Sequence, residues 1–208
     1  MKNIQIPSTT IERLPLYYRT LQNLRENGIE VISSKKLGYE LGIPSTQVRK
    51  DLSYYGEFGK RGVGYEVELL MKNLERILGV NQSWEIALIG AGNLGRALVD
   101  YKGFRRLGLH IKYLFDIDNN KIGKKLGEAK IYDIGRMSEL IKEKSIRIAI
   151  IAVPANVAQG IAEDLIDAGV KAIWNFAPAH LNLPKNIIVR DEDLSIGLIS
   201  LTYHLSDK

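Results

Sequence analysis

The 208-residue chain contains no cysteine. This absence excludes disulfides, a thiol redox switch, a cysteine nucleophile, and cysteine-ligated zinc or iron–sulfur sites. Any redox response must therefore depend on a bound ligand. The sequence also lacks clustered metal-ligating residues, so we expect no bound metal.

Long apolar runs are missing as well. No stretch approaches the length needed to cross a bilayer, and Met1–Ser8 lacks the apolar core of a secretory signal. With 45% hydrophobic and 25% charged residues, the composition is that of an ordinary globular protein. We therefore expect a cytoplasmic protein with no membrane partner.

The net charge is +5, which is only weak evidence for a nucleic-acid partner. The distribution of charge is more informative than its sum. Cations outnumber acids locally between Lys35 and Arg61. This basic segment is where we look for contacts with an anionic partner.

Helical patterns dominate the N-terminal segment. Thr9 and Glu12 have the spacing of a capping box, and apolar residues then recur at helical spacing as far as Gly28. These residues are Ile11, Leu14, Tyr18, Leu21 and Leu24. Pro15 lies inside the pattern, which predicts that the helix either kinks or restarts there.

Two short helices and a hairpin follow. Ser33 or Ser34 is expected to cap a second helix that closes at Gly42, and a third helix begins at residues 44–46. Residues 58–67 carry glycines around two cations followed by alternation, which predicts a β-hairpin with a basic tip. We therefore expect residues 1–80 to form a winged helix-turn-helix domain.

A winged helix suits double-stranded DNA. The first turn of the third helix can offer side chains to base edges, and cations of that helix and of the wing can reach phosphates. The residues that we expect at the DNA are Ser45, Thr46, Gln47, Arg49, Lys50, Tyr54, Lys60 and Arg61. The alternatives are a helical domain with a solvated basic face and a winged helix used for protein contacts.

The middle of the chain carries a dinucleotide-binding fingerprint. An apolar strand at residues 85–89 leads into the glycine turn Gly90-Ala91-Gly92-Asn93-Leu94-Gly95, and a second apolar run ends in Asp116. Gly90 makes the tight turn, Gly92 lets the backbone approach a pyrophosphate, and Gly95 allows close helix–strand packing. Apolar strands then alternate with helices. Residues 81–190 are therefore expected to form a Rossmann-type, doubly wound parallel sheet, which makes the chain an α/β protein.

The expected ligand is NAD(H). Asp116 can accept hydrogen bonds from the adenosine ribose and repels a 2′-phosphate, although Lys121, Lys124 and Lys125 weaken this preference. Other strand ends should line the same crevice, at Val153, Pro154, Asn175 and Phe176. The alternative is a Rossmann fold with a vestigial site, in which these positions are strand-ending turns and a core aromatic residue.

Catalytic machinery is sparse, so we expect NAD(H) to act as an effector ligand and not as a consumed reagent. Of His110, His180 and His204, only His180 lies near the expected nicotinamide, and it has no acidic partner nearby in sequence. The chain has no Tyr-x-x-x-Lys pair, and it leaves no room for a substrate domain. We therefore expect a protein that is not an enzyme.

The last segment, residues 191–208, predicts a helix from Asp191 to Leu205. Its acids suit the N-terminus of a helix, and leucines recur at helical spacing at Leu194, Leu198, Leu201 and Leu205. This stripe could pack on the sheet of its own chain. It could equally pack against a second subunit, because a DNA reader gains from two-fold symmetry.

Together these features resemble the Rex family of redox-sensing transcriptional repressors, and the resemblance covers essentially the whole chain. The motifs that carry it are residues 13–19, 49–56 and 59–65, the glycine turn, and residues 115–118, 153–155 and 175–178. The resemblance implies a homodimer that exchanges its C-terminal helix and leaves operator DNA when NADH binds, whereas NAD⁺ competes without releasing it.

The same resemblance implies further site residues. Asp193, at the start of the exchanged helix, would lie near the partner's nicotinamide pocket and could pair with Arg13 in the DNA-competent state. Tyr101 would join this switch, and Leu194 would line the pocket. Two other functions remain open: a small NAD-dependent oxidoreductase and a CoA-binding or ligase-related Rossmann module. The missing proton donor argues against the first, and Asp116 with the fused winged helix argues against the second.

Overall fold

A computed structural model describes residues 6–206 of the chain. The first five residues, which belong to the segment without a secretory-signal pattern, lie outside the described part. The chain divides into two compact units, residues 1–82 and 83–208. Within the described residues no helix has both the length and the apolarity needed to span a bilayer.

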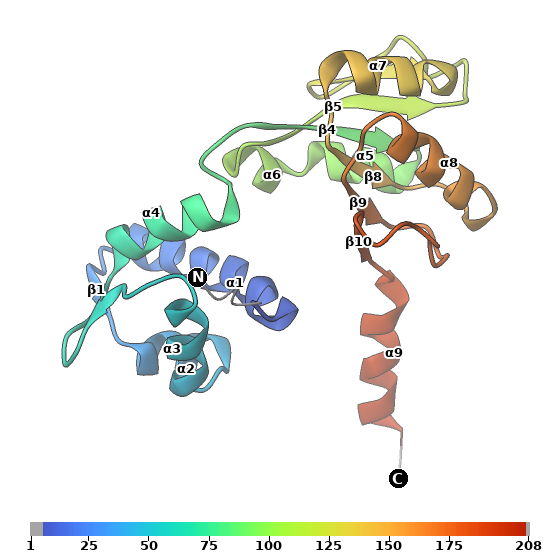
Figure 1. The fold of residues 1–208 in the computed structure, drawn as a ribbon. Helices are drawn as coiled ribbons and strands as arrows, with labels where there is room; N and C mark the ends of the chain where they lie inside the picture. The colour runs from blue at the N-terminus through green and yellow to red at the C-terminus, as the bar shows by residue number, and fades with distance from the viewer. Residues whose placement is uncertain (1–5, 207–208) are drawn as a thin grey trace. The chain divides into compact units, whose positions relative to one another are not determined.

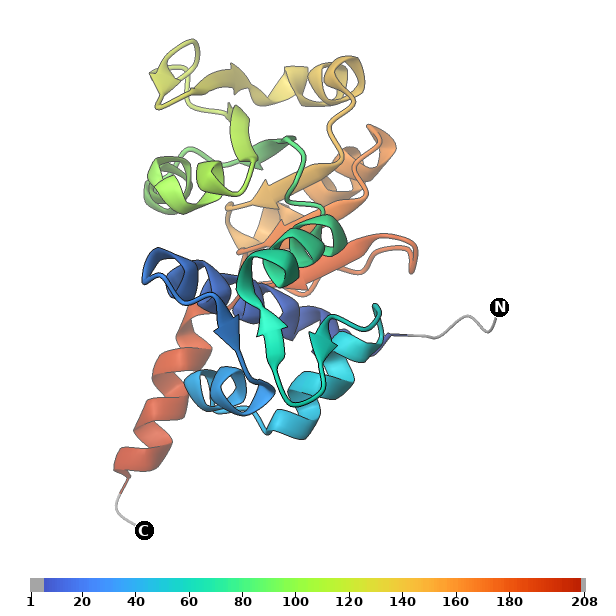
Figure 2. The ribbon, with the colours of Figure 1, turned by 90° about the vertical axis from the view of Figure 1, so that its left-hand side faces the viewer.

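The N-terminal unit combines helices with a small antiparallel sheet (Figure 1). Its elements in chain order are α1 (Ser8–Glu26), β1 (Val31–Ile32), α2 (Ser34–Leu41), α3 (Ser45–Ser53), β2 (Gly59–Lys60), β3 (Gly64–Glu66) and α4 (Val67–Leu78). Strand β3 pairs with β2 on one side and with β1 on the other. This arrangement confirms the expected winged helix-turn-helix, and Figure 2 shows the wing between α3 and α4.

Helix α1 differs in detail from the prediction. It begins after Pro7 with no side-chain cap, so Thr9 lies inside the helix and the expected capping box is wrong. Pro7 already fixes an extended backbone immediately before the first turn. Helix α1 also continues through Pro15 without restarting. Ile11 proves exposed, whereas Tyr17, one position from the expected stripe, is fully buried.

Helices α2 and α3 begin where the sequence predicts. Ser33 caps α2 by accepting a hydrogen bond from the backbone N–H of Lys36, and Gly42 closes the helix in the left-handed conformation with φ of 65°. Helix α3 starts after Pro44 and buries Val48 and Leu52. Thr46, Arg49 and Lys50 of this helix are exposed, as a recognition helix requires.

The C-terminal unit is a parallel sheet with helices on both faces (Figure 1). Its strands are β4 (Trp84–Ile89), β5 (Leu109–Asp116), β6 (Lys125–Leu126), β7 (Ala129–Asp133), β8 (Ile148–Ile151), β9 (Ala172–Asn175) and β10 (Ile188–Asp191). Its helices are α5 (Asn93–Asp100), α6 (Lys102–Arg106), the 3₁₀ turn η1 (Ile134–Arg136), α7 (Met137–Lys144), α8 (Ala155–Asp167) and α9 (Leu194–Leu205). The strand order is β10-β9-β8-β4-β5-β7-β6, and only the short β6 runs antiparallel to its neighbour.

Alternation along the central strand divides the core into two layers. Ala87 and Ile89 of β4 pack with α7 and α8 on one face, whereas Ile86 and Leu88 pack with α5 on the other. Successive strand side chains point to opposite faces, so an all-apolar strand implies cover on both sides. The structure therefore confirms the doubly wound sheet.

The final helix starts later than predicted. Asp191 is the last residue of β10, and α9 begins at Leu194 with Asp193 as its N-cap. The acids that we assigned to the first turn precede the helix because β10 pairs with β9 as far as Asp191↔Asn175. Helix α9 buries none of its residues, which overturns the option that it packs on its own sheet.

Close packing fixes the turn between β4 and α5. Gly90 has a φ of 104°, and a Cβ there would lie 2.3 Å from the carbonyl oxygen of Ala152. A Cβ on Gly95 would lie only 2.0 Å from the carbonyl oxygen of Gly90. Both contacts are with backbone that cannot step aside, so only glycine fits these two positions.

We predict that Gly95→Ala separates α5 from β4 and lowers stability by about 1–3 kcal/mol, the usual cost of overpacking. Thermal unfolding measures this change. Gly160→Ala in α8 is the matched control, because its Cβ would meet nothing within 4 Å and alanine favours helix. A Gly95→Ala variant as stable as the Gly160→Ala variant would contradict the packing argument.

Candidate dinucleotide site and nucleic-acid interface

Three adjacent parallel strands end at the same edge of the sheet. Gly90 follows β4, Val153 and Pro154 follow β8 after one residue, and Phe176 follows β9. Ligands of open α/β sheets bind at the carboxyl ends of the strands. The structure thus brings together at one edge the predicted site residues from three distant parts of the sequence.

The N-terminus of α5 opens at this edge. Its N-cap is Gly92, and no side chain caps the free backbone N–H groups. A Cβ built on Gly92 meets no heavy atom within 4 Å, and Asn93 is exposed while Leu94 is half-buried. Unsatisfied N–H groups and the helix dipole attract anions, so this end fits a pyrophosphate.

Asp116 ties the end of β5 to the glycine turn. Its Oδ2 accepts a hydrogen bond from the N–H of Ala91 at 2.7 Å, and its Oδ1 accepts one from the N–H of Asp118 at 2.8 Å. Lys121 Nζ lies 3.2 Å from Oδ2. Burial raises the pKa of Asp116, but the hydrogen bonds from the two N–H groups, and then Lys121, outweigh burial. The net pKa is lowered, so the carboxylate stays ionised.

These contacts give Ala91 and Lys121 definite roles. The Ala91 N–H points at Asp116, so it shapes the turn and is committed within the protein. Lys121 neutralises part of the charge that would repel a 2′-phosphate, as the nearby lysines in the sequence suggested. A carboxylate has about four acceptor sites, which leaves Asp116 capacity for a ribose hydroxyl.

Asn175 is fully buried, and both N–H donors of its side-chain amide are used. It donates to the Ala179 carbonyl and to Asp191 Oδ1, both at 2.8 Å, and accepts from the Ala177 N–H. The side chain therefore fixes the loop after β9 and the end of β10. Its direct contact with a ligand stays a prediction.

The sequence left His180 without a partner, and the fold supplies one. His180 Nδ1 lies 3.5 Å from Asp191 Oδ2, although the histidine side chain is 87% exposed. Eleven positions separate the two residues, so only the pairing of β9 with β10 brings them together.

An aromatic row crosses the α5 and α6 side of the sheet. Tyr101 meets Phe104 with ring centroids 4.9 Å apart, Phe104 meets Trp174 at 6.0 Å, and Trp174 meets Phe176 at 4.5 Å. Tyr101 and Phe176 were predicted site residues, and the two rings between them were not. The helical break at Tyr101, which ends α5 and starts α6, gave no signal in the sequence.

The root of α9 is held by its own cap. Asp193 Oδ1 accepts hydrogen bonds from the hydroxyl of Ser195 at 2.6 Å and from its N–H at 2.8 Å. These bonds lower the pKa of Asp193. Beyond this cap, Leu194 is 64% exposed, and every large apolar side chain of α9 is at least half exposed.

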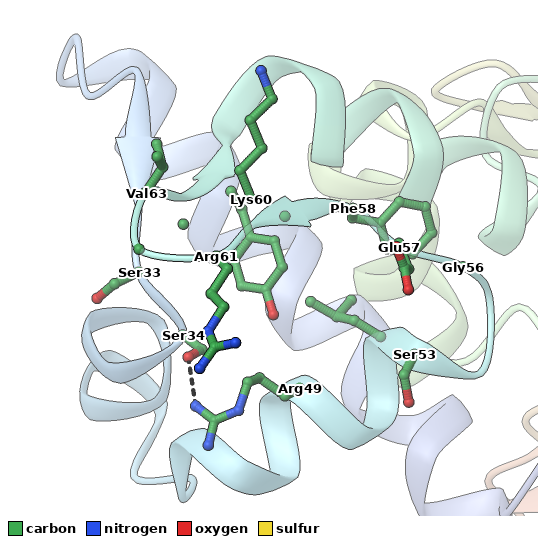
Figure 3. Close-up of a pocket in the computed structure, with 15 residues that line it drawn as sticks. Ser33, Ser34, Arg49, Ser53, Gly56, Glu57, Phe58, Lys60, Arg61 and Val63 are labelled. Atoms are coloured by element: carbon green, nitrogen blue, oxygen red, sulfur yellow. Dashed lines mark hydrogen bonds between the residues drawn. The ribbon is translucent and has the colours of Figure 1, made fainter.

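In the N-terminal unit, a groove of about 630 Å³ lies between the wing and α3. Figure 3 shows Arg49 from α3 and Arg61 from the wing tip pointing into the same space, while Lys60 points away from it. Arg49 Nη1 donates to the Ser34 hydroxyl at 2.9 Å. Thr46, Lys50, Lys60 and Arg61 are exposed, and Ser45, Gln47 and Tyr54 are half-buried. The predicted DNA-facing residues thus lie on α3, at its C-cap Tyr54 and on the hairpin.

Two predicted residues meet at a third that sequence reasoning missed. Arg13 and Gln47 both donate to the buried carboxylate of Asp51. Asp51 follows Val48 by three positions and precedes Leu52, so it lies on the apolar side of α3. A charged residue in that position of a helical stripe was the available signal. The predicted pairing of Arg13 with Asp193 stays a prediction.

The described residues hold no group of three or more histidine, cysteine, aspartate or glutamate side chains placed to bind a metal ion together.

Comparison with known proteins agrees with both units. Residues 5–53 match the family model described as "Putative DNA-binding protein N-terminus", and residues 81–179 match the one described as "CoA binding domain". Over 205 residues the chain is 48% identical to the redox-sensing transcriptional repressor Rex of Carboxydothermus hydrogenoformans, with 99% of each chain covered. Rex of Pelotomaculum thermopropionicum is also 48% identical, over 100% of this chain and 98% of its own.

Solved structures agree. A structure titled as RSP in complex with β-NAD⁺ and operator DNA superposes with a TM-score of 0.91 at 38% identity, covering 96% of this chain and 92% of that one. RSP in complex with β-NADH superposes with a TM-score of 0.89 at 36% identity, covering 98% and 95%. RSP is described as a Rex-family repressor. With near-complete coverage at this identity, the chain belongs to the Rex family of redox-sensing transcriptional repressors.

Proposed function

We propose that this protein binds operator DNA as a homodimer and leaves it when NADH occupies the site at the glycine turn. The observation that carries the proposal is the joint presence of an open α5 N-terminus beside Asp116 and a cationic groove on a winged helix. Such a protein would report the NADH/NAD⁺ ratio to transcription. It would act in the cytoplasm, where bacterial operators lie.

Three features support NADH as the effector. The uncapped N-terminus of α5 suits a pyrophosphate, and Asp116 keeps acceptor capacity for an adenosine ribose. The β8 and β9 ends supply Val153, Pro154 and Phe176 at the same edge, where a nicotinamide would bind. The related RSP has been solved with both β-NAD⁺ and β-NADH.

Operator binding is supported by the groove between α3 and the wing. Ser45, Thr46 and Gln47 occupy the first turn of α3, the part of a recognition helix that contacts base edges. Arg49, Lys50, Lys60 and Arg61 supply charge for phosphates, and such contacts position the protein on the duplex.

Homodimer formation with exchanged helices is supported by α9. A helix that is apolar all round requires cover, and α9 leaves seven large apolar side chains exposed, from Leu194 to Leu205. A two-fold dimer would place two recognition helices on successive major grooves. An exchanged α9 would also bring Asp193 and Leu194 to the partner's site.

Release by NADH requires that NADH bind the DNA-free arrangement more tightly than the DNA-bound one. NADH and NAD⁺ differ by a hydride and one positive charge, so the pocket must sense that charge or the shape of the ring. We propose that Asp193, Arg13 and Tyr101 form this sensor, and that closure of the Rossmann pair moves the recognition helices off the half-site spacing.

The alternative function is a small NAD-dependent oxidoreductase, and the pair His180–Asp191 is the feature that favours it. We propose no enzymatic activity, because a side chain this exposed gives a reacting group little shelter from water. Loss of NADH absorbance at an enzyme-like rate with a small carbonyl substrate would favour the alternative.

The first prediction from this proposal concerns release. A palindromic duplex selected by the protein from a random pool should lose affinity by about tenfold or more when NADH is added, a usual size for allosteric coupling. NAD⁺ at saturation should compete with NADH and cause no release. Fluorescence anisotropy of labelled duplex measures both effects. Unchanged affinity at saturating NADH would sink the proposal.

The second prediction concerns assembly. Leu198→Asp places a charge on the apolar surface of α9 and should convert the dimer to a monomer, with operator affinity falling steeply. Leu198→Met conserves volume and should leave the dimer intact. Sedimentation velocity at several protein concentrations separates the two, and a dimeric Leu198→Asp variant would argue against the exchanged helix.

The third prediction concerns the switch. Asp193→Ala should weaken operator binding or reduce the NADH response, because it removes the charge that would face Arg13. It also removes the side-chain cap of α9. Asp193→Asn keeps the cap and loses the charge, so it should behave as Asp193→Ala does. If Asp193→Asn responds to NADH as the unmodified protein does, the charge has no role in the switch.

A further inference from the structure

Helix α3 carries a carboxylate in the core of the N-terminal unit. The side chain of Asp51 is 0% exposed. Transfer of an ionised carboxylate from water into a protein interior is costly unless donors surround it. The groups around Asp51 therefore have to be held in place for α3 to pack at all.

Five hydrogen bonds reach this carboxylate. Oδ1 accepts from the Thr10 hydroxyl at 3.0 Å, from Arg13 Nη2 at 2.8 Å and from Gln47 Nε2 at 2.7 Å. Oδ2 accepts from Arg13 Nε at 2.6 Å and from the Tyr17 hydroxyl at 2.7 Å. Thr10, Arg13 and Tyr17 all belong to α1, so this one side chain joins α3 to α1.

The cluster is charged and stays so. Burial raises the pKa of Asp51, but the hydrogen bonds from Arg13, Tyr17, Gln47 and Thr10 outweigh it and bring the pKa to about 2. The hydrogen bond with Asp51 likewise raises the pKa of Arg13. Because the folded-state pKa of Asp51 is lowered, its contribution to stability is present above about pH 4 and is lost as the pH falls towards 2.

Asp51 also sets the orientation of Gln47, one turn earlier on the same helix. One N–H of the Gln47 amide is bound to Oδ1, which leaves its Oε1 and its second N–H. An amide oxygen and an N–H side by side are the pair that contacts adenine N6 and N7 in a major groove. The carboxylate thus restricts the rotamer of a side chain positioned to contact a base.

Arg13 has donors left after serving Asp51. It binds the carboxylate side-on through Nε and Nη2, and its side chain is 23% exposed. A guanidinium offers five N–H groups, so a second acid can approach the other side. A group that attracts Arg13 would weaken the hydrogen bonds from Arg13 to Asp51, the carboxylate that holds α3 and Gln47.

We propose that Asp51 is a positioning residue for sequence recognition: it aims Gln47 and couples the angle of α3 to Arg13. The specific part of DNA binding then depends on the Arg13–Asp51 pair, whereas the phosphate contacts do not. The inference rests on the operator binding of the proposed function, and its extension to the NADH response rests also on release by NADH.

A hydrogen bond elsewhere in the N-terminal unit shows what a purely structural role for Asp51 would resemble. Tyr18, also on α1, donates to Glu75 of α4 at 2.9 Å, and burial together with Glu75 raises the pKa of Tyr18 to about 12. This bond joins α1 to α4 and touches neither α3 nor Gln47. Glu75→Gln is therefore the matched control for Asp51→Asn.

The experiment uses the full chain and two duplexes, the selected operator and a scrambled sequence of equal length. Affinities for both are measured over a range of salt concentrations. Asp51→Asn should reduce the operator-to-scrambled ratio by roughly tenfold or more, the discrimination of one bidentate base contact. Binding to the scrambled duplex and its salt slope should stay unchanged, because Arg49, Lys50, Lys60 and Arg61 are untouched. Glu75→Gln should lower the melting temperature and keep the ratio.

A second variant covers the case in which Asp51→Asn does not fold. Arg13→Lys keeps the positive charge and loses the two-pronged contact, so it should reduce the ratio in the same direction. An unchanged ratio in a folded Asp51→Asn or Arg13→Lys variant would overturn the proposal, as would an equal loss in Glu75→Gln.

Adding NADH separates this inference from the proposed function. NADH should reduce the specificity ratio of the unmodified protein strongly and that of Asp51→Asn little. If NADH leaves the unmodified protein on its operator, the proposed function fails, but the comparison of variants without NADH still decides the role of Asp51.

Discussion

A carboxylate removed from water must be surrounded by donors, and in each unit one such carboxylate determines the local geometry. Asp51 gathers hydroxyl, guanidinium and amide donors from α1 and α3. Asp116 gathers backbone N–H groups from the glycine turn and from the loop after β5. Because the penalty for a missing donor falls on a buried charge, these contacts are more exacting than the apolar packing around them.

The two carboxylates have different consequences. Asp116 fixes a loop against a strand end, so it preorganises a binding edge that needs little rearrangement. Asp51 fixes a whole helix against another helix, so a change in its surroundings changes the direction of α3. A rigid edge suits the binding of an effector, and a helix joined to its neighbour through one buried carboxylate suits a response to it.

Sequence patterns predicted the elements well where a local cause is strong. Gly42 ends α2 in the left-handed conformation. In the turn between β4 and α5, Gly90 and Gly95 lie where neighbouring backbone leaves no space for a Cβ. The patterns failed where a residue outside the recognised motif, or a strand pairing, decides where an element begins or ends. Thr9 had the spacing of a capping box, yet Pro7 set the start of α1. Asp191 read as helical, yet its pairing opposite Asn175 extends β10.

The candidate site shows the same division. The glycine turn and Asp116 were evident from the sequence, because a dinucleotide site requires these residue types at this spacing. The Asp51 cluster was not, since its donors Thr10, Arg13 and Tyr17 lie 34 to 41 positions away along the chain. Phe104 of α6 and Trp174 of β9 likewise meet although 70 positions separate them along the chain. Contacts between residues so far apart along the chain produce no periodic pattern in the sequence.

The exposed apolar surface of α9 has a consequence for how the proposed dimer assembles. A newly made chain presents the exposed apolar side chains of α9 to its neighbours, and in the proposed dimer a second copy of the chain covers them. When chains are scarce, the concentration of the proposed dimer then grows with the square of the chain concentration. A cell that makes few copies would hold most of them as unpaired halves, so the threshold for repression would be set by synthesis as well as by the effector.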